Sequence, residues 1–216
     1  MSEKHRPDAN NHPWEKIFAQ DGRVFTEKLP AQKEFEDRFS QHGFRQILDL
    51  GCGNGRHVVA LASLDFEVIG LDISRTGLDL TQQWLNECGI SAHLLKADTR
   101  HPLPLRDNVV DGLISTQVIH HAYRAEVLLA ITEIRRILRP GGLAFVTVPC
   151  RSHSRRKSNK IERHTYLPLD GSEAGLPHHI FSKQRLRRAF RGFIIHDISY
   201  RDDGRILAIW AEKPIN

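Results

Sequence analysis

Three glycines placed one residue apart, Gly51, Gly53 and Gly55, follow Asp49 at the end of an apolar run. Glycines at such positions let the chain turn sharply out of a strand and let the backbone approach a ligand. The spacing differs from the G-x-G-x-x-G of dinucleotide sites, since Arg56 stands where the third glycine would be. A carboxylate at Asp49 disfavours a pyrophosphate and suits an ammonium group. S-adenosylmethionine, which has an amino group, a sulfonium and no phosphate, therefore fits this turn better than a dinucleotide.

Polar side chains also follow three more apolar runs, which we predict to be strands of the same sheet. The residues at these strand ends are Asp72, Asp98 with Thr99, and Thr116 with Gln117. Open α/β sheets bind ligands at the edge where the carboxyl ends of their strands meet. At that edge, Asp72 can accept hydrogen bonds from both ribose hydroxyls, and Asp98 can accept one from an adenine amino group.

Four segments of the chain closely resemble motifs of the class I S-adenosylmethionine-dependent methyltransferases, specifically the type 11 group. These segments are residues 48–55, 70–74, 97–98 and 133–142, all within about residues 44–149. The resemblance implies S-adenosylmethionine as the cofactor and a Rossmann-like α/β fold. That fold has a seven-stranded mixed sheet of order 3-2-1-4-5-7-6 with helices on both faces. The residues that the resemblance and the strand ends assign to the cofactor are Asp49, Gly51, Cys52, Gly53, Asp72, Ile73, Asp98, Thr99, Thr116 and Gln117. Among these, the resemblance places Asp49, Gly51 and Gly53 at the methionine end.

Hydrophobic periodicity and stop signals predict the elements that hold these residues. Helices are expected at about residues 32–41, 54–64, 75–88, 124–138 and 182–190, and further strands at about 143–148, 193–200 and up to 211. Asp203-Gly204 predicts a two-residue hairpin turn between the last two strands. The sequence assigns no element to an insertion at about residues 149–180.

Composition predicts a single domain over residues 1–216. The chain has 216 residues of which 40% are hydrophobic, enough for one sizeable core. No apolar run approaches the ~20 residues of a membrane helix, and the polar first residues predict no secretion signal. Three scattered cysteines, Cys52, Cys88 and Cys150, predict neither a disulfide framework nor a metal site. We therefore expect a cytoplasmic protein that makes no membrane contact.

The insertion carries most of the excess positive charge. Within residues 151–164, Arg151, Arg155, Arg156, Lys157, Lys160 and Arg163 stand against the single acid Glu162. Such a run is either a solvated loop or a contact for an anionic acceptor, RNA or a phosphorylated small molecule.

Paired histidines are a second unusual feature, at His120-His121 and at 178–179. A histidine near the cofactor edge could remove a proton from an acceptor oxygen or nitrogen, because its usual pKa of ~6.5 suits a general base. The candidate bases are His121, His179 and Tyr166. Zinc is not predicted, since adjacent histidines rarely chelate together and the spacing matches no known motif.

An aromatic pair near the N-terminus predicts either a cover over the cofactor or ordinary packing. Trp14 and Phe18 are spaced i and i+4, so they share one face of a helix. We assign a lid segment to about residues 12–43, because methyl transfer needs alignment of donor and acceptor and exclusion of water more than it needs acid or base chemistry.

Three functions are compatible with these features. The leading hypothesis is methyl transfer to an O or N nucleophile of a small molecule. The alternative is a tRNA or rRNA methyltransferase that uses the basic insertion at residues 151–164. The third is a non-catalytic, methyltransferase-like subunit that binds the cofactor, which the intact Asp49, Asp72 and Asp98 argue against. The sequence leaves the oligomeric state open.

Overall fold

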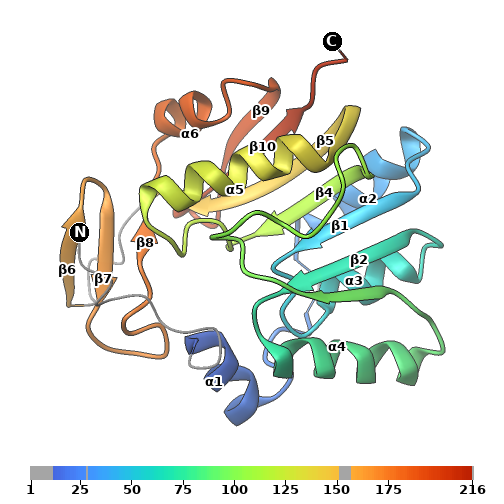
Figure 1. Ribbon diagram of the computed structural model, residues 1–216, viewed down its shortest axis with the longest axis horizontal. Helices are drawn as coiled ribbons and strands as arrows, with labels where there is room; N and C mark the ends of the chain where they lie inside the picture. The colour runs from blue at the N-terminus through green and yellow to red at the C-terminus, as the bar shows by residue number, and fades with distance from the viewer. Residues whose placement is uncertain (1–11, 28, 151–156, 216) are drawn as a thin grey trace.

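A seven-stranded sheet forms the centre of the molecule, in the order β3-β2-β1-β4-β5-β10-β9 (Figure 1). The computed structural model describes residues 12–27, 29–150 and 157–215. The strands are β1 Gln46–Leu50, β2 Glu67–Asp72, β3 His93–Lys96, β4 Val110–Thr116, β5 Leu138–Pro149, β9 Ile194–Arg201 and β10 Ile206–Glu212. Since β9 and β10 are the sixth and seventh strands of this sheet along the chain, the predicted order 3-2-1-4-5-7-6 is confirmed. The antiparallel strand β10 inserts between β5 and β9.

Helices cover both faces of the sheet, as predicted. They are α1 Pro13–Asp21, α2 Gln32–Gln41, α3 Arg56–Ala62, α4 Arg75–Cys88, α5 Arg124–Ile137 and α6 Lys183–Ala189. Buried apolar side chains of α5 and α6 form one core with one face of the sheet, and those of α2, α3 and α4 form a second core with the other face. Figure 1 shows α5 in front of the sheet and α2 and α3 behind it. In the described part of the chain, no helix has the length and apolar character to cross a membrane.

Backbone conformation explains where the element boundaries differ from the sequence prediction. Helix α3 begins at Arg56, not at residue 54, because Gly55 has a φ of 92° that no helix contains. The last hairpin has a four-residue loop, not a two-residue turn, since Ile206 pairs with Arg201. Two aspartates of this loop adopt positive φ angles, which Asp tolerates better than most residues.

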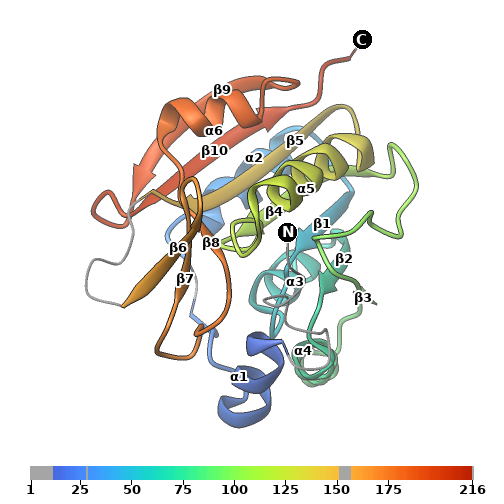
Figure 2. The same cartoon turned by 60° about the vertical axis from the view of Figure 1, so that its left-hand side comes forward.

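The insertion folds into a separate three-stranded antiparallel sheet, which the sequence did not predict. Its strands are β6 Ser158–Glu162, β7 Thr165–Pro168 and β8 His178–His179. Each strand has five residues or fewer, too few to show a clear alternating pattern. Figure 2 shows the β6–β7 hairpin beside the main sheet, above α1.

The expected lid segment contains two helices with different surroundings. Helix α2 is part of the core, because Phe35 and Phe39 are fully buried and contact Phe145 and Trp210 of the sheet. Helix α1 instead packs on α4 at the carboxyl edge. Only the part of the segment before α2 is therefore placed to cover a ligand.

Candidate functional site

A cavity of about 720 Å³ opens at the carboxyl edge of the parallel strands. Its volume lies within the roughly 300–1,000 Å³ of typical ligand sites. Nine of the ten predicted cofactor residues line it, namely Gly51, Cys52, Gly53, Asp72, Ile73, Asp98, Thr99, Thr116 and Gln117. The tenth, Asp49, lies beneath the glycine turn and is 1% exposed. The sequence therefore located this cavity, whose base is the glycine turn.

Backbone hydrogen bonds and a close side-chain contact fix the glycine turn. The amides of Gly51 and Cys52 both donate to the carbonyl of Leu71 on β2, at 2.7 and 3.0 Å. Gly51 has a φ of 81°, and a Cβ there would come within 2.3 Å of the Val118 side chain. Only glycine fits between this turn and the loop after β4.

Asp49 is a buried carboxyl group without a hydrogen-bond partner among the described residues. Its neighbour is His57, with 3.8 Å between Asp49 Oδ2 and His57 Nδ1, too long for a hydrogen bond. Burial raises the pKa of Asp49 to about 8 and lowers the pKa of His57 to about 3. At neutral pH the histidine is therefore uncharged and Asp49 is largely protonated, so this pair is not a salt bridge.

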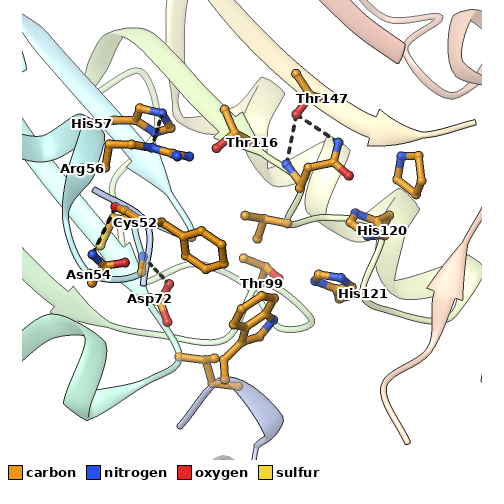
Figure 3. A pocket seen from close by; sticks show the side chains of 18 of the residues that line it. Cys52, Asn54, Arg56, His57, Asp72, Thr99, Thr116, His120, His121 and Thr147 are labelled. Carbon is orange, nitrogen blue, oxygen red and sulfur yellow. Dashed lines mark hydrogen bonds between the residues drawn. The ribbon is translucent and has the colours of Figure 1, made fainter. Parts of the chain in front are cut away.

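Asp72 organises the turn as well as lining the cavity. Its Oδ2 accepts a hydrogen bond from the Gly53 amide and its Oδ1 accepts one from the Ser74 amide, both at 2.8 Å. Each carboxylate oxygen has a second lone pair, which leaves capacity for a ligand hydroxyl. Figure 3 shows Asp72 beside the turn that carries Cys52 and Asn54.

Asp98 lies at the predicted strand end but is engaged by Arg100. The guanidinium donates to both oxygens of Asp98, with Nε to Oδ1 at 2.9 Å and Nη2 to Oδ2 at 2.7 Å. This arginine lowers the pKa of Asp98 against the opposing effect of burial, so the group is ionised. Arg100 also lines the cavity, and the Asp98-x-Arg100 spacing was the signal that sequence reasoning missed.

Gln117 is held by Thr147 of β5, a second residue that sequence reasoning missed. The Thr147 hydroxyl oxygen accepts from the backbone amide of Gln117 at 3.0 Å and from its side-chain amide at 3.2 Å (Figure 3). These bonds accompany a φ of 60° at Gln117, a conformation uncommon outside glycine. The turn directs the following residues, up to His121, along the rim of the cavity.

Helix α1 forms one wall of the cavity. Trp14 and Phe18 line it, and the Phe18 ring lies 3.1 Å from where a Cβ on Gly53 would be. Glu15 attaches the helix to the start of α4, because its carboxylate accepts from the hydroxyls of Ser74, at 2.6 Å, and Thr76. The helix therefore lies directly over the glycine turn.

The histidine pairs reach the cavity only in part. His120 and His121 line it, and Figure 3 shows them across the cavity from Asp72. Of the second pair, His178 lines the cavity and His179 does not. His179 is 4% exposed and bonds through Nδ1 to the Thr165 hydroxyl at 2.8 Å, and burial lowers its pKa to about 4. Tyr166 is also absent from the lining, so His121 is the one candidate base that the structure brings to the cavity.

Comparisons with known proteins decide what kind of domain this is. Residues 48–146 match the family described as "Methyltransferase domain". Residues 48–146 are a methyltransferase domain of the class I, S-adenosylmethionine-dependent kind. This matched range contains the glycine turn and the strand ends that line the cavity, so the methyl donor is S-adenosylmethionine.

Relatives of this methyltransferase domain act on different acceptors. The chain is 34% identical over 116 residues to a ubiquinone biosynthesis O-methyltransferase of Chelativorans sp. (strain BNC1), covering 54% of this chain and 42% of that protein. It is 33% identical over 103 residues to the tRNA (carboxymethyluridine(34)-5-O)-methyltransferase ALKBH8 of Mus musculus. This match covers 47% of this chain and 14% of that protein. The chain thus spans less than half the length of these curated relatives. Its fold matches the PH0226 protein from Pyrococcus horikoshii OT3 with a TM-score of 0.71 at 18% identity, over 99% of both chains.

The residues of the methyltransferase domain fit its cofactor. The orphaned carboxyl group of Asp49 lies beneath a turn whose glycines admit a close backbone approach. A cationic amino group in the cavity above would favour the ionised form of Asp49. The remaining lone pairs of the Asp72 carboxylate can accept hydrogen bonds from the ribose hydroxyls of the cofactor.

Proposed function

We propose that this protein transfers a methyl group from S-adenosylmethionine to an O or N nucleophile of a small molecule. The proposal rests on how the cavity is enclosed opposite the strand ends, on the side where we place the acceptor. Trp14 and Phe18 of α1, Phe25 of the following loop and Glu173 and His178 of the insertion line the same cavity as the strand ends. A cavity covered from these segments favours an acceptor small enough to be enclosed.

Binding and alignment account for most of the proposed mechanism. Bound S-adenosylmethionine supplies an activated methyl group, so the protein needs to hold donor and nucleophile in line at about 3 Å and to exclude water. Asp49 and Asp72 orient the methionine and ribose ends in this proposal, and α1 excludes water. His121 is positioned to take the proton of an acceptor hydroxyl or amine, if that acceptor is protonated at neutral pH.

RNA is the second candidate acceptor, and two observations favour it. One relative acts on tRNA by its name. Lys157, Lys160 and Arg163 are exposed around β6, where a phosphate backbone could contact them. The other predicted basic residues of the insertion, Arg151, Arg155 and Arg156, lie outside the described residues.

The test combines cofactor binding with a methyl-transfer assay. Titration with S-adenosylhomocysteine should give one binding event, and labelled S-adenosylmethionine should then label compounds in a small-molecule extract. The test variant is Lys157→Ala/Lys160→Ala/Arg163→Ala. The matched control is Lys33→Ala/Arg45→Ala/Arg106→Ala, which removes three exposed cations that do not line the cavity. If the unmodified protein labels RNA, and the test variant loses this labelling while the control variant keeps it, the RNA function replaces the small-molecule proposal. Binding without transfer to either fraction would support the non-catalytic subunit.

A further inference from the structure

Three histidines and one glutamate meet on the acceptor side of the cavity. The ring centroids of His120, His121 and His178 lie 3.8 to 5.4 Å apart, and one nitrogen of each lies within 4.8 Å of the others. The carboxylate of Glu173 completes the group, with one oxygen toward His121 and the other toward His178. We propose that these four side chains bind one divalent transition-metal ion.

The distances within this group suit ligands of a shared ion better than direct hydrogen bonds. His121 Nε2 lies 3.5 Å from Glu173 Oε1, and His178 Nε2 lies 3.7 Å from Glu173 Oε2. Hydrogen bonds between such groups are about 2.7–3.2 Å long. Ligand atoms held at about 2.0–2.1 Å around a tetrahedral zinc ion are about 3.3–3.4 Å from one another. A rotation of the Glu173 carboxylate would bring one of its oxygens to this spacing from His121 and His178, and the histidine nitrogens, which lie within 4.8 Å of one another, would move closer around the ion.

The backbone holds the two contributing segments together. His120 and His121 follow β4, whereas His178 begins β8, and the amide of His179 donates to the carbonyl of His120 at 2.8 Å. Successive residues of a strand face opposite sides. Thr165 binds the His179 ring on one side, so His178 faces the cavity on the other. Backbone contacts thus bring the two segments together without a metal.

The ligand chemistry selects the class of ion. Three imidazoles and one carboxylate suit borderline ions such as Zn²⁺, Mn²⁺, Fe²⁺ or Co²⁺. Mg²⁺ and Ca²⁺ prefer sets made of oxygen ligands. The sequence predicted no zinc at the paired histidines, because adjacent histidines rarely chelate together. The structure brings His178 and Glu173 beside His120 and His121, and Glu173 belongs to the insertion that periodicity left unassigned.

The location of the group gives the ion a role in the acceptor half of the cavity. All four side chains line it. A bound ion that takes an acceptor hydroxyl as its fifth ligand would lower the pKa of that hydroxyl, and the released proton would pass to solvent. This catalytic role rests on the proposed function, whereas metal binding itself does not.

Metal binding can be measured without cofactor or acceptor. Chelator-treated, full-length protein is titrated with Co²⁺, whose visible absorption reports its ligands, and then with competing Zn²⁺. The variants are Glu173→Gln and His178→Gln. The matched control is His196→Gln, which breaks another histidine–carboxylate pair, His196 with Glu212 at 2.7 Å, on the far strand β9. Thermal unfolding checks that each variant is folded.

We expect one Co²⁺ per chain, displaced by Zn²⁺ and not by Mg²⁺ at equal concentration. The Glu173 and His178 variants should lose at least tenfold in affinity, since even partners outside the first ligand sphere contribute about 10–100-fold. His196→Gln should bind as the unmodified protein does. Absence of binding, or equal binding by all variants, overturns the site and leaves His121 as a base. S-adenosylhomocysteine binding is measured on the same samples, so failure of the metal site is distinguishable from failure of the proposed function.

Discussion

Asp49 shows how a single residue can be unfavourable for the fold and suited to a ligand. The carboxyl group is 1% exposed and has no hydrogen-bond partner among the described residues. Burying such a group disfavours its charged form, which is why its pKa rises to about 8. A cationic ligand would supply the missing partner.

The stability of the protein without cofactor should therefore fall with pH because of Asp49. The pKa is raised from 3.8 to about 8 on folding, so between these values the folded protein keeps a proton that the unfolded chain has lost. The resulting contribution is complete below pH 3.8 and is lost as pH rises toward 8. Asp49→Asn should lack this slope. Urea unfolding of both proteins at pH 5 and pH 8 measures the difference, and parallel pH profiles would contradict the assignment.

Cofactor binding should reverse the protonation of Asp49. At pH 7 the binding of S-adenosylhomocysteine should release about one proton, because its amino group favours the ionised carboxylate. Calorimetry in two buffers of different ionisation enthalpy gives the number of protons. The release should disappear in Asp49→Asn. Equal binding enthalpies in both buffers for the unmodified protein would show that Asp49 stays protonated.

Replacing Asp72 with alanine should weaken cofactor binding by ~1.5–3 kcal/mol, through loss of charge-assisted hydrogen bonds. Part of this loss would come from the turn, since the amides of Gly53 and Ser74 both donate to this carboxylate. Titration with S-adenosylhomocysteine measures it. Asp79→Ala, an exposed change on α4, is the control. Unchanged affinity in Asp72→Ala would remove Asp72 from the binding residues.

Nine residues that the sequence predicted for the cofactor line the cavity, although Arg100 and Thr147 were missed, whereas the acceptor half was not predicted. Asp72, Asp98 and Gln117 follow apolar strands of one sheet, so their common location follows from topology. Glu173 and His178 reach the cavity only through the fold of the insertion, which no local pattern encodes. The sequence predicted His179 as a candidate base, but His178 is the residue that lines the cavity. Sequence alone does not tell which of two adjacent side chains faces inward.

At the scale of elements, the attachment of α1 to α4 determines how the cavity is covered. Glu15 bonds to the hydroxyls of Ser74 and Thr76, close to the amino end of α4. A carboxylate is favourable at this end of a helix. These bonds lower the pKa of Glu15, although its partial burial opposes this.

Removing this attachment should loosen α1 without unfolding the domain. Glu15→Ala should speed hydrogen exchange in residues 13–21 and weaken S-adenosylhomocysteine binding about three- to tenfold, equivalent to ~0.6–1.4 kcal/mol. Lys16→Ala, on the exposed side of the same helix, should change neither quantity. If the Glu15 variant keeps the exchange rate of the unmodified protein, the attachment does not hold α1.

For the whole molecule, α2 connects the last two strands to the rest of the fold. Glu34 of α2 accepts from Trp210 Nε1 of β10 at 2.7 Å and from Arg201 of β9 at 2.8 Å. Trp210 is 1% exposed, and its ring packs at a tilt against that of Phe145 of β5, with centroids 4.9 Å apart. The strand order of this region was predictable from the resemblance, but this contact, 176 residues apart in the chain, was not.

Glu34→Ala should lower the free energy of unfolding by ~1–3 kcal/mol, because the buried N–H of Trp210 loses its acceptor. Glu34→Gln keeps an acceptor oxygen and should recover most of this loss. Urea unfolding followed by Trp fluorescence measures both variants. Equal stability of the alanine variant and the unmodified protein would mean that Trp210 finds another partner.

The separate origin of the two halves of the cavity has a consequence for evolution. The strand ends and the glycine turn lie within residues 48–146, whereas much of the opposite wall comes from α1, the loop after it and the insertion, outside that range. Substitutions in these outer stretches that spare Glu15 and Phe18 should change the acceptor wall and leave the glycine turn and the strand ends as they are. Descendants of one ancestral chain could thus diverge in substrate without an inactive intermediate. In the laboratory, a library restricted to residues 22–27, 29–31 and 157–181 would vary the acceptor wall while leaving α1, the glycine turn and the strand ends unchanged.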